Sequence, residues 1–529
     1  MSAPNPWRAL RYPLFRNLWL ATVVSNVGSW MYSAAAGWLM TSLNSNAVIV
    51  SLVQVANSLP LFLLALPAGA IADLFDRRRL ILVLEILTTI VSAIFALLVS
   101  LHRVDPSTLL LFALAVAILG ALETPAWQAI VPQLVPSEAL ASAVATNSVG
   151  INVSRAIGPA LGGVVILTLG IAMPFWFDAF SNLGVIMVIL LWRVTPRPKS
   201  ALPSEHLRSA VRGGLRYARN SRPLRAALVR ASGFFVFASA YWALLPLTAR
   251  EQIHGGPTLY GLLLGSIGLS AIVGALVLPR IVERLGSDMT VVFGGLLTAA
   301  ALVLFAVANS PTLGLLACLF AGVSWIAVVA TLNVSAQRAL PDWVRGRGLA
   351  IYTAAFFGTM SLGSVIWGYL AEHTGLRTAQ LVAAAGAALA ALLTRRAKLS
   401  SGPLPDLTPS MHWPPPVLSG REAEDPGQVM VTVDYRVQEH HRQAFLTALD
   451  SVARGRRRDG AYDWRIFVDS AHADRFIEVF FVDSWLEHMR QHRRVTVADQ
   501  HAQERLRELL NAEPVVTHYI EPLDRPSDA

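Results

Sequence analysis

Five ionisable side chains lie inside otherwise apolar runs of the chain, and these residues are the best suited to chemistry. They are Glu85, Glu123, Arg155, Asp178 and Arg230. A charge in such surroundings is costly unless it faces a cavity or a partner. A carboxyl group there can also take up and release a proton, because partners and desolvation control its ionisation. These residues therefore indicate buried charge pairing, proton transfer or both.

Glu123 and Arg155 fall at comparable depth in neighbouring apolar runs, which makes a buried ion pair one hypothesis. A second hypothesis places Glu123 and Glu85 in a structural network with the charged segment that precedes Glu85. The sequence leaves both alternatives open.

The elements that must position these residues are apolar runs of spanning length. About 20 apolar residues suffice for a helix to cross the roughly 30 Å of hydrocarbon in a bilayer. Within the first 400 residues we count twelve such runs, at 18–39, 48–72, 80–100, 108–131, 139–169, 174–192, 224–249, 259–282, 289–308, 313–336, 349–371 and 379–393. The chain has 54% hydrophobic and 15% charged residues and a mean hydropathy of +0.51. We therefore expect an all-α polytopic membrane protein.

The segment Gly69–Arg79, GAIADLFDRRR, joins two of these runs and fixes their orientation. Lys and Arg in short connections mark the cytoplasmic side of a membrane, and this segment contains three consecutive arginines. With a cytoplasmic N-terminus, most basic residues fall in inside connections, so we expect both termini to be cytoplasmic. The net charge of +9 then lies beside lipid headgroups and predicts no nucleic-acid partner. The single Cys318 predicts neither a disulfide framework nor a zinc cluster.

The two sets of six runs resemble each other. An offset of about 205 residues relates Pro136 to Pro341 and also relates three pairs of glycines, namely Gly69 and Gly274, Gly158 and Gly363, and Gly163 and Gly368. Matches at one offset indicate a duplicated six-helix unit, as in transporters that hold substrate between two halves.

The remaining segments differ in composition from the apolar runs. Residues 194–223 are basic and amphipathic, and predict a cytoplasmic connector between bundles at 1–193 and 224–398. Residues 399–427 are rich in proline and predict a linker. Residues 428–529 alternate strand and helix patterns in the order βαββαβ, which predicts a small cytoplasmic ferredoxin-like domain.

The spacing of Gly69, Asp73, Arg77 and Arg78 resembles the connection between the second and third helices of the major facilitator superfamily of secondary transporters. The resemblance implies a cytoplasmic gate latch. Gly69 would allow close helix contact, Asp73 would face a helix N-terminus, and the two arginines would pair with carboxylates. The family usually has glycine just before the basic pair, where this chain has Asp76.

The sequence SRAIGPALGG from Ser154 resembles the motif in the fifth helix of antiporters of the same superfamily. Gly158, Gly162 and Gly163 would allow close helix contact, and Pro159 would remove a backbone donor and kink the helix. The alternative is generic packing of small residues.

The whole chain resembles bacterial transmembrane secretion effectors, a group that contains enterobactin-exporter-like proteins. The segments that carry the resemblance are the latch, SRAIGPALGG, PDWVRGRG from Pro341, and RRRDGAYDWRIF and SWLEHMRQHRR near the C-terminus. The resemblance implies a multi-pass inner-membrane transporter that exports a siderophore, drug or metabolite by alternating access and proton antiport. The last domain alone resembles dimeric α+β-barrel domains of the antibiotic-biosynthesis-monooxygenase type, which implies self-association.

Further polar and aromatic residues within the runs are candidates for an amphipathic cavity: Asn26, Asn152, Tyr241, Trp242 and Trp325. Each of them alone is also consistent with an interface anchor or a packing residue.

Two further features bear on alternative functions. His488 and His492 are four residues apart on a predicted helix, but no third ligand is evident in the local pattern, so we expect neither a metal site nor a cofactor. No Walker A sequence occurs, which argues against a nucleotide-powered exporter. The competing interpretation is a membrane-anchored enzyme or sensor whose C-terminal domain carries the activity, but an anchor would not need duplicated helices with buried charge.

Overall fold

The computed structural model describes residues 8–192, 207–399, 406–410, 412–413 and 427–521. The chain divides into two compact units. Unit 1 comprises Met1–Pro203, Ala227–Val334 and Tyr352–Leu399, and unit 2 comprises Ser204–Ala226, Ser335–Ile351 and Ser400–Ala529. Unit 2 therefore groups the C-terminal domain with the connector and with the turn between two long helices. The predicted linker falls mostly outside the described residues, and the predicted domain boundaries remain a prediction.

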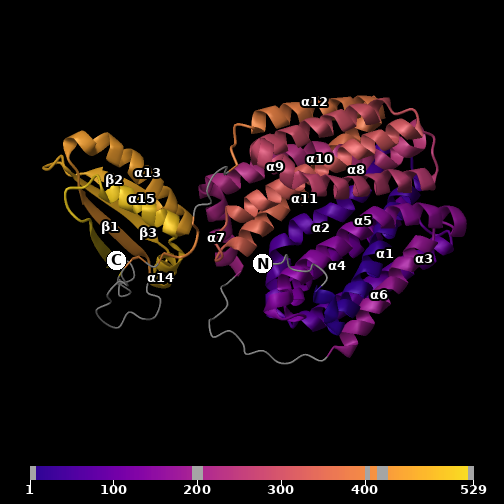
Figure 1. The fold of residues 1–529 in the computed structure, drawn as a ribbon, viewed down its shortest axis with the longest axis horizontal. Coiled ribbons are helices and arrows are strands. Elements are labelled where there is room, and N and C mark those ends of the chain that lie inside the picture. Colours follow the sequence, from indigo (N-terminus) through magenta and orange to yellow (C-terminus); the bar gives the residue numbers. More distant parts are fainter. Residues whose placement is uncertain (1–7, 193–206, 400–405, 411, 414–426, 522–529) are drawn as a thin grey trace, which may run out of the picture. The chain divides into compact units, whose positions relative to one another are not determined.

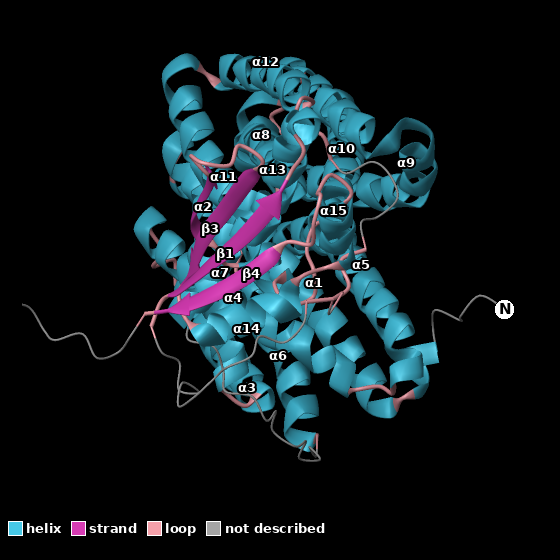
Figure 2. Ribbon diagram, turned by 90° about the vertical axis from the view of Figure 1, so that its left-hand side faces the viewer, coloured by secondary structure: helices cyan, strands magenta, loops and turns pink. Residues whose placement is uncertain are grey.

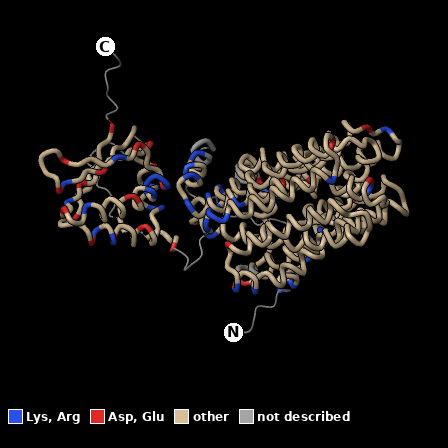
Figure 3. The backbone as a smooth tube through the Cα atoms, turned by 90° about the horizontal axis from the view of Figure 1, so that it is seen from above, with Lys and Arg blue, Asp and Glu red and all other residues tan. Residues whose placement is uncertain are grey.

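Unit 1 is formed by long apolar helices (Figure 1). The first set is α1 Pro13–Leu43, α2 Ala47–Leu74, α3 Arg77–Ser100, α4 Pro106–Ile130, α5 Leu140–Leu169 and α6 Met173–Leu191. The second set is α8 Arg222–Leu247, α9 Pro257–Val307, α10 Pro311–Arg338, α11 Arg345–Thr374 and α12 Leu376–Thr394. Charged residues are sparse along these helices (Figure 3).

Among the described residues, ten helices are long and apolar enough to cross a membrane. One of them, α9, has 51 residues and bends at Gly286, whose φ of 73° lies in the left-handed region that favours glycine. It therefore supplies two of the predicted crossings. α1 has 31 residues and is not among the ten, because serines, Asn17 and Asn26 lower its hydropathy. With α9 counted twice and α1 added, the described helices confirm the twelve-helix fold.

The α2–α3 connection shows why Asp76 stands where glycine was expected. Asp76 is the N-cap of α3, and its side chain accepts a hydrogen bond from the backbone N–H of Arg79 at 2.9 Å. The N-cap carboxylate satisfies one of the free donors at the helix start. The residue has φ −62° and ψ 115°, so the turn does not require glycine.

The glycines related by the offset of 205 make equivalent contacts in the two halves. A Cβ atom on Gly158 of α5 would lie 2.6 Å from Trp30 of α1, and one on Gly363 of α11 would lie 2.4 Å from the carbonyl of Val236 in α8. Because α1 and α8 each begin a set of helices, the same packing occurs twice. These contacts confirm the duplicated unit.

The second pair of related glycines packs the two halves together. A Cβ on Gly163 would lie 2.6 Å from the carbonyl oxygen of Pro257 at the start of α9. A Cβ on Gly368 would lie 2.0 Å from Oγ of Ser51 near the start of α2. The contacts α5–α9 and α11–α2 are therefore pseudo-equivalent, and glycine permits the close approach in both.

Unit 2 contains a four-stranded antiparallel sheet (Figure 2) in the order β2-β3-β1-β4. The strands are β1 Val429–Arg436, β2 Tyr462–Val468, β3 Arg475–Val482 and β4 Val515–Ile520, and the helices of the domain are α13 Arg442–Asp459, α14 Trp485–Arg494 and α15 Val497–Arg507. This topology confirms the βαββαβ prediction. The second helix of the predicted βαββαβ order is in fact two helices, α14 and α15, because Thr496 and Asp499 form a capping box that starts α15.

One face of the sheet forms the core of this domain. Buried residues alternate along β1, as expected for a strand with one covered face, and Val431, Phe445 and Phe480 belong to this core. The core also contains Glu478, which is fully buried and accepts a hydrogen bond from Tyr435 Oη at 2.7 Å. Arg456 Nε lies 2.7 Å from Glu478 and compensates its charge.

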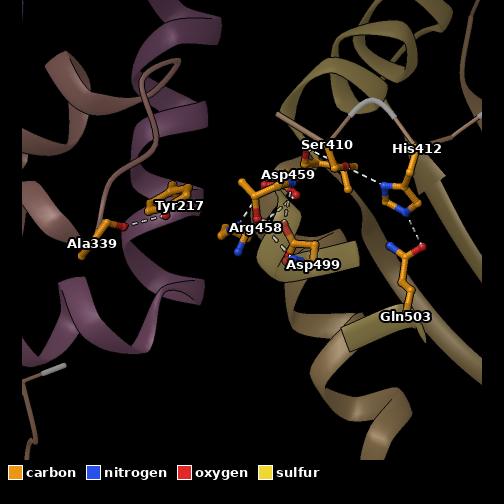
Figure 4. Close-up of polar contacts among 10 residues, drawn as sticks. Tyr217, Ala339, Ser410, His412, Arg458, Asp459, Asp499 and Gln503 are labelled. Carbon is orange, nitrogen blue, oxygen red and sulfur yellow. Dashed lines mark hydrogen bonds and ion pairs between the residues drawn. The ribbon is translucent and has the colours of Figure 1, made fainter. Parts of the chain in front are cut away.

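The connector is helical from Leu207 to Asn220 (α7) and packs within unit 2. The hydroxyl group of its Tyr217 donates to the carbonyl of Ala339, in the turn between α10 and α11, at 2.7 Å (Figure 4). The guanidinium of Arg458 lies 5.7 Å from the centre of the Tyr217 ring. Burial raises the pKa of Tyr217 to about 12, so the phenol remains a donor at neutral pH. The amphipathic prediction therefore agrees with a helix whose apolar face meets protein.

Candidate functional site

A small cavity lies between the two halves of unit 1. Helices α1 and α5 contribute from the first half, and α8, α9 and α10 contribute from the second. The residues that line it are Trp30, Arg155, Pro159, Trp242, Leu264, Ile267, Gly268, Ala271 and Trp325. The cavity therefore combines one cation with three indole rings in an otherwise apolar wall.

Arg155 has no carboxylate partner among the described residues. Its guanidinium lies 5.4 Å from the centre of the Trp30 ring, and its Nε is buried without a hydrogen-bond acceptor. The indole Nε1 of Trp242 is also buried and without an acceptor. Buried donors are nearly always satisfied in folded proteins. Two unsatisfied donors in one cavity are suited to an acceptor-bearing ligand.

Of the two alternatives for Glu123, the structure shows no ion pair with Arg155 among the described residues. The side chain of Glu123 instead lies close enough to Glu85 for a hydrogen bond between the carboxyl groups. Glu85 on α3 and Glu123 on α4 each lie about two turns from the α2–α3 end of the bundle, the end at which α2 meets α3. Arg155 belongs to the opposite wall of α5, toward the second half. The comparable depth of Glu123 and Arg155 in their apolar runs does not show which face of α5 carries Arg155.

Two carboxyl groups in such contact repel each other when both are ionised, so a proton shared between them would stabilise the pair. The pair lies inside the first half, where Glu85 is 6% exposed. It is the described group in unit 1 whose chemistry best fits reversible proton binding.

Asp178 forms a separate polar site within the first half. Its carboxyl oxygens accept hydrogen bonds from Ser29 at 3.1 Å and from Ser92 at 2.8 Å. These contacts tie α6 to α1 and α3. The side chain is 1% exposed and does not line the cavity.

Arg230 is bound by backbone and side-chain groups of its own half of unit 1. Its guanidinium donates to the carbonyls of Ala397, Asp288 and Arg395 at 2.8–3.1 Å, and it pairs with the Asp288 carboxylate at 2.8 Å. This complete set of acceptors favours a structural role over coupling.

The small residues of the motif in α5 let two helices, α1 and α9, approach α5 closely. A Cβ on Gly158 would lie 2.6 Å from Trp30 of α1, and a Cβ on Gly162 would lie 3.2 Å from Met31 of the same helix. On the other face, the carbonyl oxygen of Pro159 lies 2.6 Å from the position of a Cβ on Gly261 of α9. The motif therefore packs α5 against both halves beside the cavity.

The latch residues are only partly described. The side chain of Asp73 lies outside the described part, and a Cβ on Gly69 would meet no described atom within 4 Å. Arg77 Nε reaches the carbonyl of Ala72 at 3.5 Å. Among the described side chains, Arg78 meets no carboxylate. It donates to the carbonyls of Ile189 and Leu190 at 3.0 Å, because a helix C-terminus offers free acceptors and negative charge.

Of the remaining cavity candidates, Trp242 and Trp325 line the cavity and the others do not. Tyr241 is fully buried and packs beside Trp242. Asn152 donates to the carbonyl of Ser148 on its own helix at 2.8 Å, and Asn26 is not part of the lining. The sequence analysis missed the wall formed by α9, including Gly268 and Ala271, because small apolar residues there look like ordinary helix packing.

Contacts between the halves cluster toward the α1–α2 end, the end opposite the latch. The backbone N–H of Ala47 donates to Glu372 at 2.7 Å, and Arg250 donates to Ser42 at 2.7 Å. Ser58 and Ser361 share a hydrogen bond of 2.7 Å nearer the middle. This end is therefore closed, whereas Gly69 at the latch end meets no described neighbour.

Comparison with known proteins gives a consistent picture. A model of the transmembrane secretion effector family matches residues 4–527. The staphyloferrin A transporter of Staphylococcus aureus (strain NCTC 8325 / PS 47) is 26% identical over 66% of this chain and 87% of its own length. The multidrug efflux pump Tap of Mycolicibacterium fortuitum is 26% identical over 67% and 88%. The enterobactin exporter EntS of Citrobacter koseri is 24% identical over 68% and 85%.

Solved structures support the fold. An inward-facing, unoccupied bacterial homologue of the human lysosomal transporter Spinster matches with a TM-score of 0.57 and 15% identity, over 74% of this chain and 98% of the other. A POT family transporter in complex with 5-aminolevulinic acid matches with a TM-score of 0.59 and 13% identity, over 72% and 94%. At these identities the likeness concerns the fold alone.

Proposed function

We propose that this chain, which belongs to the transmembrane secretion effector family, exports a small amphipathic molecule across the bacterial inner membrane by alternating access. The observation that carries the proposal is the cavity between the halves, with its unpaired Arg155 and three tryptophans. The family and its relatives are transporters and not enzymes. This argues against the alternative of a membrane-anchored enzyme.

The cavity favours a substrate that bears an anionic group beside an aromatic or flat apolar part. Arg155 would bind the anion, and Trp242 and Trp325 would contact the apolar part. Relatives named for staphyloferrin A, enterobactin and multiple drugs make a siderophore or an acidic drug the first candidates.

We propose that both termini and the latch are cytoplasmic, as the arginines of the α2–α3 connection favour. The closed α1–α2 end then faces outward and the conformation is inward-facing. In the opposite state the latch end would close, and Gly69, Asp73 and the adjoining arginines would contact the second half. Gly69→Leu should then slow transport by hindering that closure.

Protons are the proposed counter-ion, with Glu85 and Glu123 as the exchanging pair. Their mutual contact gives the carboxyl pair one readily exchanged proton. Asp178 is the second candidate, because hydroxyl donors from two helices surround it. We also propose that the C-terminal domain self-associates through the sheet face that its helices leave uncovered. Light scattering of the full chain with and without residues 428–529 would measure this.

The decisive experiment is flux into inside-out proteoliposomes under an imposed pH gradient. An anionic catechol or carboxylate siderophore, its neutral ester and a cationic drug should be compared in one preparation. We expect gradient-driven uptake of the anionic compound and at least about 10-fold slower uptake of its ester, since one charge-assisted contact contributes about 1.5–3 kcal/mol. Uptake that ignores both the gradient and the charge of the substrate would refute the proposal.

A further inference from the structure

Three histidines meet on the C-terminal domain, although they are distant in sequence. His488 and His492 lie on α14, and His518 lies on β4. One ring nitrogen from each lies within 4.8 Å of the others, and His488 is 2% exposed. The third residue was missing from the sequence analysis because only the sheet, in which β4 pairs with β1, brings it beside α14.

The spacing of the first two rings matches that of metal ligands. Nε2 of His488 and Nε2 of His492 are 3.2 Å apart. Two nitrogens bound at about 2.0–2.1 Å to a tetrahedral ion are separated by about 3.3 Å. His518 reaches the same point from the other side, with its ring centre 4.8 Å from that of His488. The arrangement needs little change to place three nitrogens around one ion.

A neighbouring side chain orients the most buried of the three rings. Nδ1 of His488 lies 3.3 Å from Oε1 of Gln491. A hydrogen bond from Nδ1 to this oxygen leaves the lone pair on Nε2, which points toward His492. Metal-binding histidines are commonly oriented in this way by an outer partner.

Two tryptophans enclose the cluster. The ring of Trp413 meets that of His492 at 4.9 Å and 77°, and the ring of Trp485 meets that of His518 at 6.0 Å and 78°. Such edge contacts restrict rotation of the imidazoles and reduce their exposure to water. The cluster is therefore held in place before any ion binds.

A neighbouring cation, Arg456, does not prevent cation binding. Arg456 faces the cluster, but its Nε lies 2.7 Å from the buried Glu478, which compensates it. His412 is the other titratable neighbour, and both its ring nitrogens already contact Ser410 and Gln503.

We propose that His488, His492 and His518 form a binding site for a late first-row transition-metal ion, Zn²⁺ or Cu²⁺. Imidazole nitrogens suit both ions, whereas Mg²⁺ and Ca²⁺ prefer oxygen ligands. Three histidines leave a fourth position open for water or an anion. The site is distinct from the cavity of unit 1 and does not depend on the transported substrate.

The test is a metal titration of the full-length protein in detergent, purified with a tag that contains no histidine. Zn²⁺, Cu²⁺ and Mg²⁺ are titrated against a competing chelator. We expect one equivalent of Zn²⁺ or Cu²⁺ to bind and Mg²⁺ not to bind. His518→Gln should weaken binding at least about 10-fold, and Gln491→Ala should weaken it about 10- to 100-fold. His440→Gln, at an exposed histidine of the same domain, should leave binding unchanged.

Electron paramagnetic resonance of the Cu²⁺-loaded wild type provides a readout that does not depend on whether a variant folds. Three nitrogen ligands are expected in its hyperfine pattern, and two in His518→Gln. Equal affinity of wild type and His518→Gln for both ions would overturn the proposal. Fewer than three nitrogens in the wild-type spectrum, or affinity no better than for Mg²⁺, would do so as well.

Discussion

Arg155 and Arg458 are both largely buried, yet their surroundings are opposite. Arg458, in unit 2, donates to both carboxyl oxygens of Asp459 at 2.9 Å and to Asp499 at 2.6 Å (Figure 4). Arg155, in unit 1, has no carboxylate among its described neighbours and stacks on Trp30. An arginine whose donors are saturated holds a structure together, whereas one with a free donor in a cavity remains available to a ligand.

Arg230 shows that the contrast does not simply separate membrane from domain. It lies in the same unit as Arg155, but three backbone carbonyls and Asp288 surround it. Unit 1 therefore contains both kinds of arginine. What distinguishes Arg155 is its place on the cavity wall between the halves.

The largest expected effect follows from removing a saturated arginine. Arg458→Ala would remove the guanidinium that both Asp459 and Asp499 bind in a buried site, which should cost about 3–5 kcal/mol of stability in the C-terminal domain. Hydrogen exchange of the α13 amides in the full-length protein would measure this. Arg457→Ala is the matched control, because that side chain only stacks on Trp464, a contact of about 0.5–1 kcal/mol. Similar losses of stability in Arg458→Ala and Arg457→Ala would mean that the carboxylate partners of Arg458 add no stability, and would contradict the contrast between Arg458 and Arg155.

Removing the unsaturated arginine should affect transport and not stability. Arg155→Gln is expected to lower flux of an anionic substrate about 10- to 100-fold, since a charge-assisted hydrogen bond is worth about 1.5–3 kcal/mol. The melting temperature should not fall, because no buried partner loses its counter-charge. Asn152→Ala, one turn earlier on α5 and bonded only to Ser148, should transport normally. Unfolding of Arg155→Gln would instead mean that the residue is structural.

A double-mutant cycle distinguishes the two alternatives for the partner of Glu123. Glu85→Gln and Glu123→Gln should be strongly non-additive in proton-driven flux, with a coupling of about 1–2 kcal/mol, because the two carboxyl groups act as one site. Glu123→Gln and Arg155→Gln should be additive within about 0.5 kcal/mol. Exchange of substrate for substrate should survive in Glu123→Gln, since exchange needs no proton release. Coupling between Glu123 and Arg155 would restore the original ion pair in another conformation.

The sequence predicted those parts of the structure that depend on periodicity and composition. The spanning runs, the duplicated glycines at an offset of 205 and the βαββαβ order of the last domain were all readable. Close packing at Gly158 and Gly163 was also readable, because only small residues allow helices to approach so closely.

The pairing of side chains could not be predicted from the sequence, because it depends on which face of a helix carries a side chain and on how helices rotate about one another. For this reason the sequence left both Arg155 and Glu85 open as partners of Glu123, and the structure places Glu123 beside Glu85. Arg78 was matched to a carboxylate although the free carbonyls of α6 were nearer. His518 was overlooked because a strand pairing brings it to α14.

The smallest expected effect concerns Asp459, a carboxylate partner of Arg458, and the pH dependence of its contribution to stability. Burial raises the pKa of Asp459 to about 6, above the 3.8 of an unperturbed carboxyl, despite Arg458. Asp499 differs: Arg458 and hydrogen bonds involving Thr496 outweigh its burial and lower its pKa. Between pH 7 and pH 5 only Asp459 of this pair therefore titrates in the folded domain.

A carboxyl whose folded pKa is raised destabilises the fold while it is ionised, and this cost disappears as the pH falls through the folded pKa. Wild type should therefore gain about 1–1.5 kcal/mol relative to Asp459→Asn between pH 7 and pH 5, one pKa unit being worth about 1.4 kcal/mol. Other titrating groups are common to both proteins, so the difference in α13 hydrogen exchange isolates this residue. A difference that does not change with pH would mean that Arg458 keeps Asp459 ionised throughout. Arg458 would then hold both carboxylates, Asp459 and Asp499, in the ionised state at both pH values. The stability of this site would not depend on pH in this range, which would strengthen the contrast with Arg155.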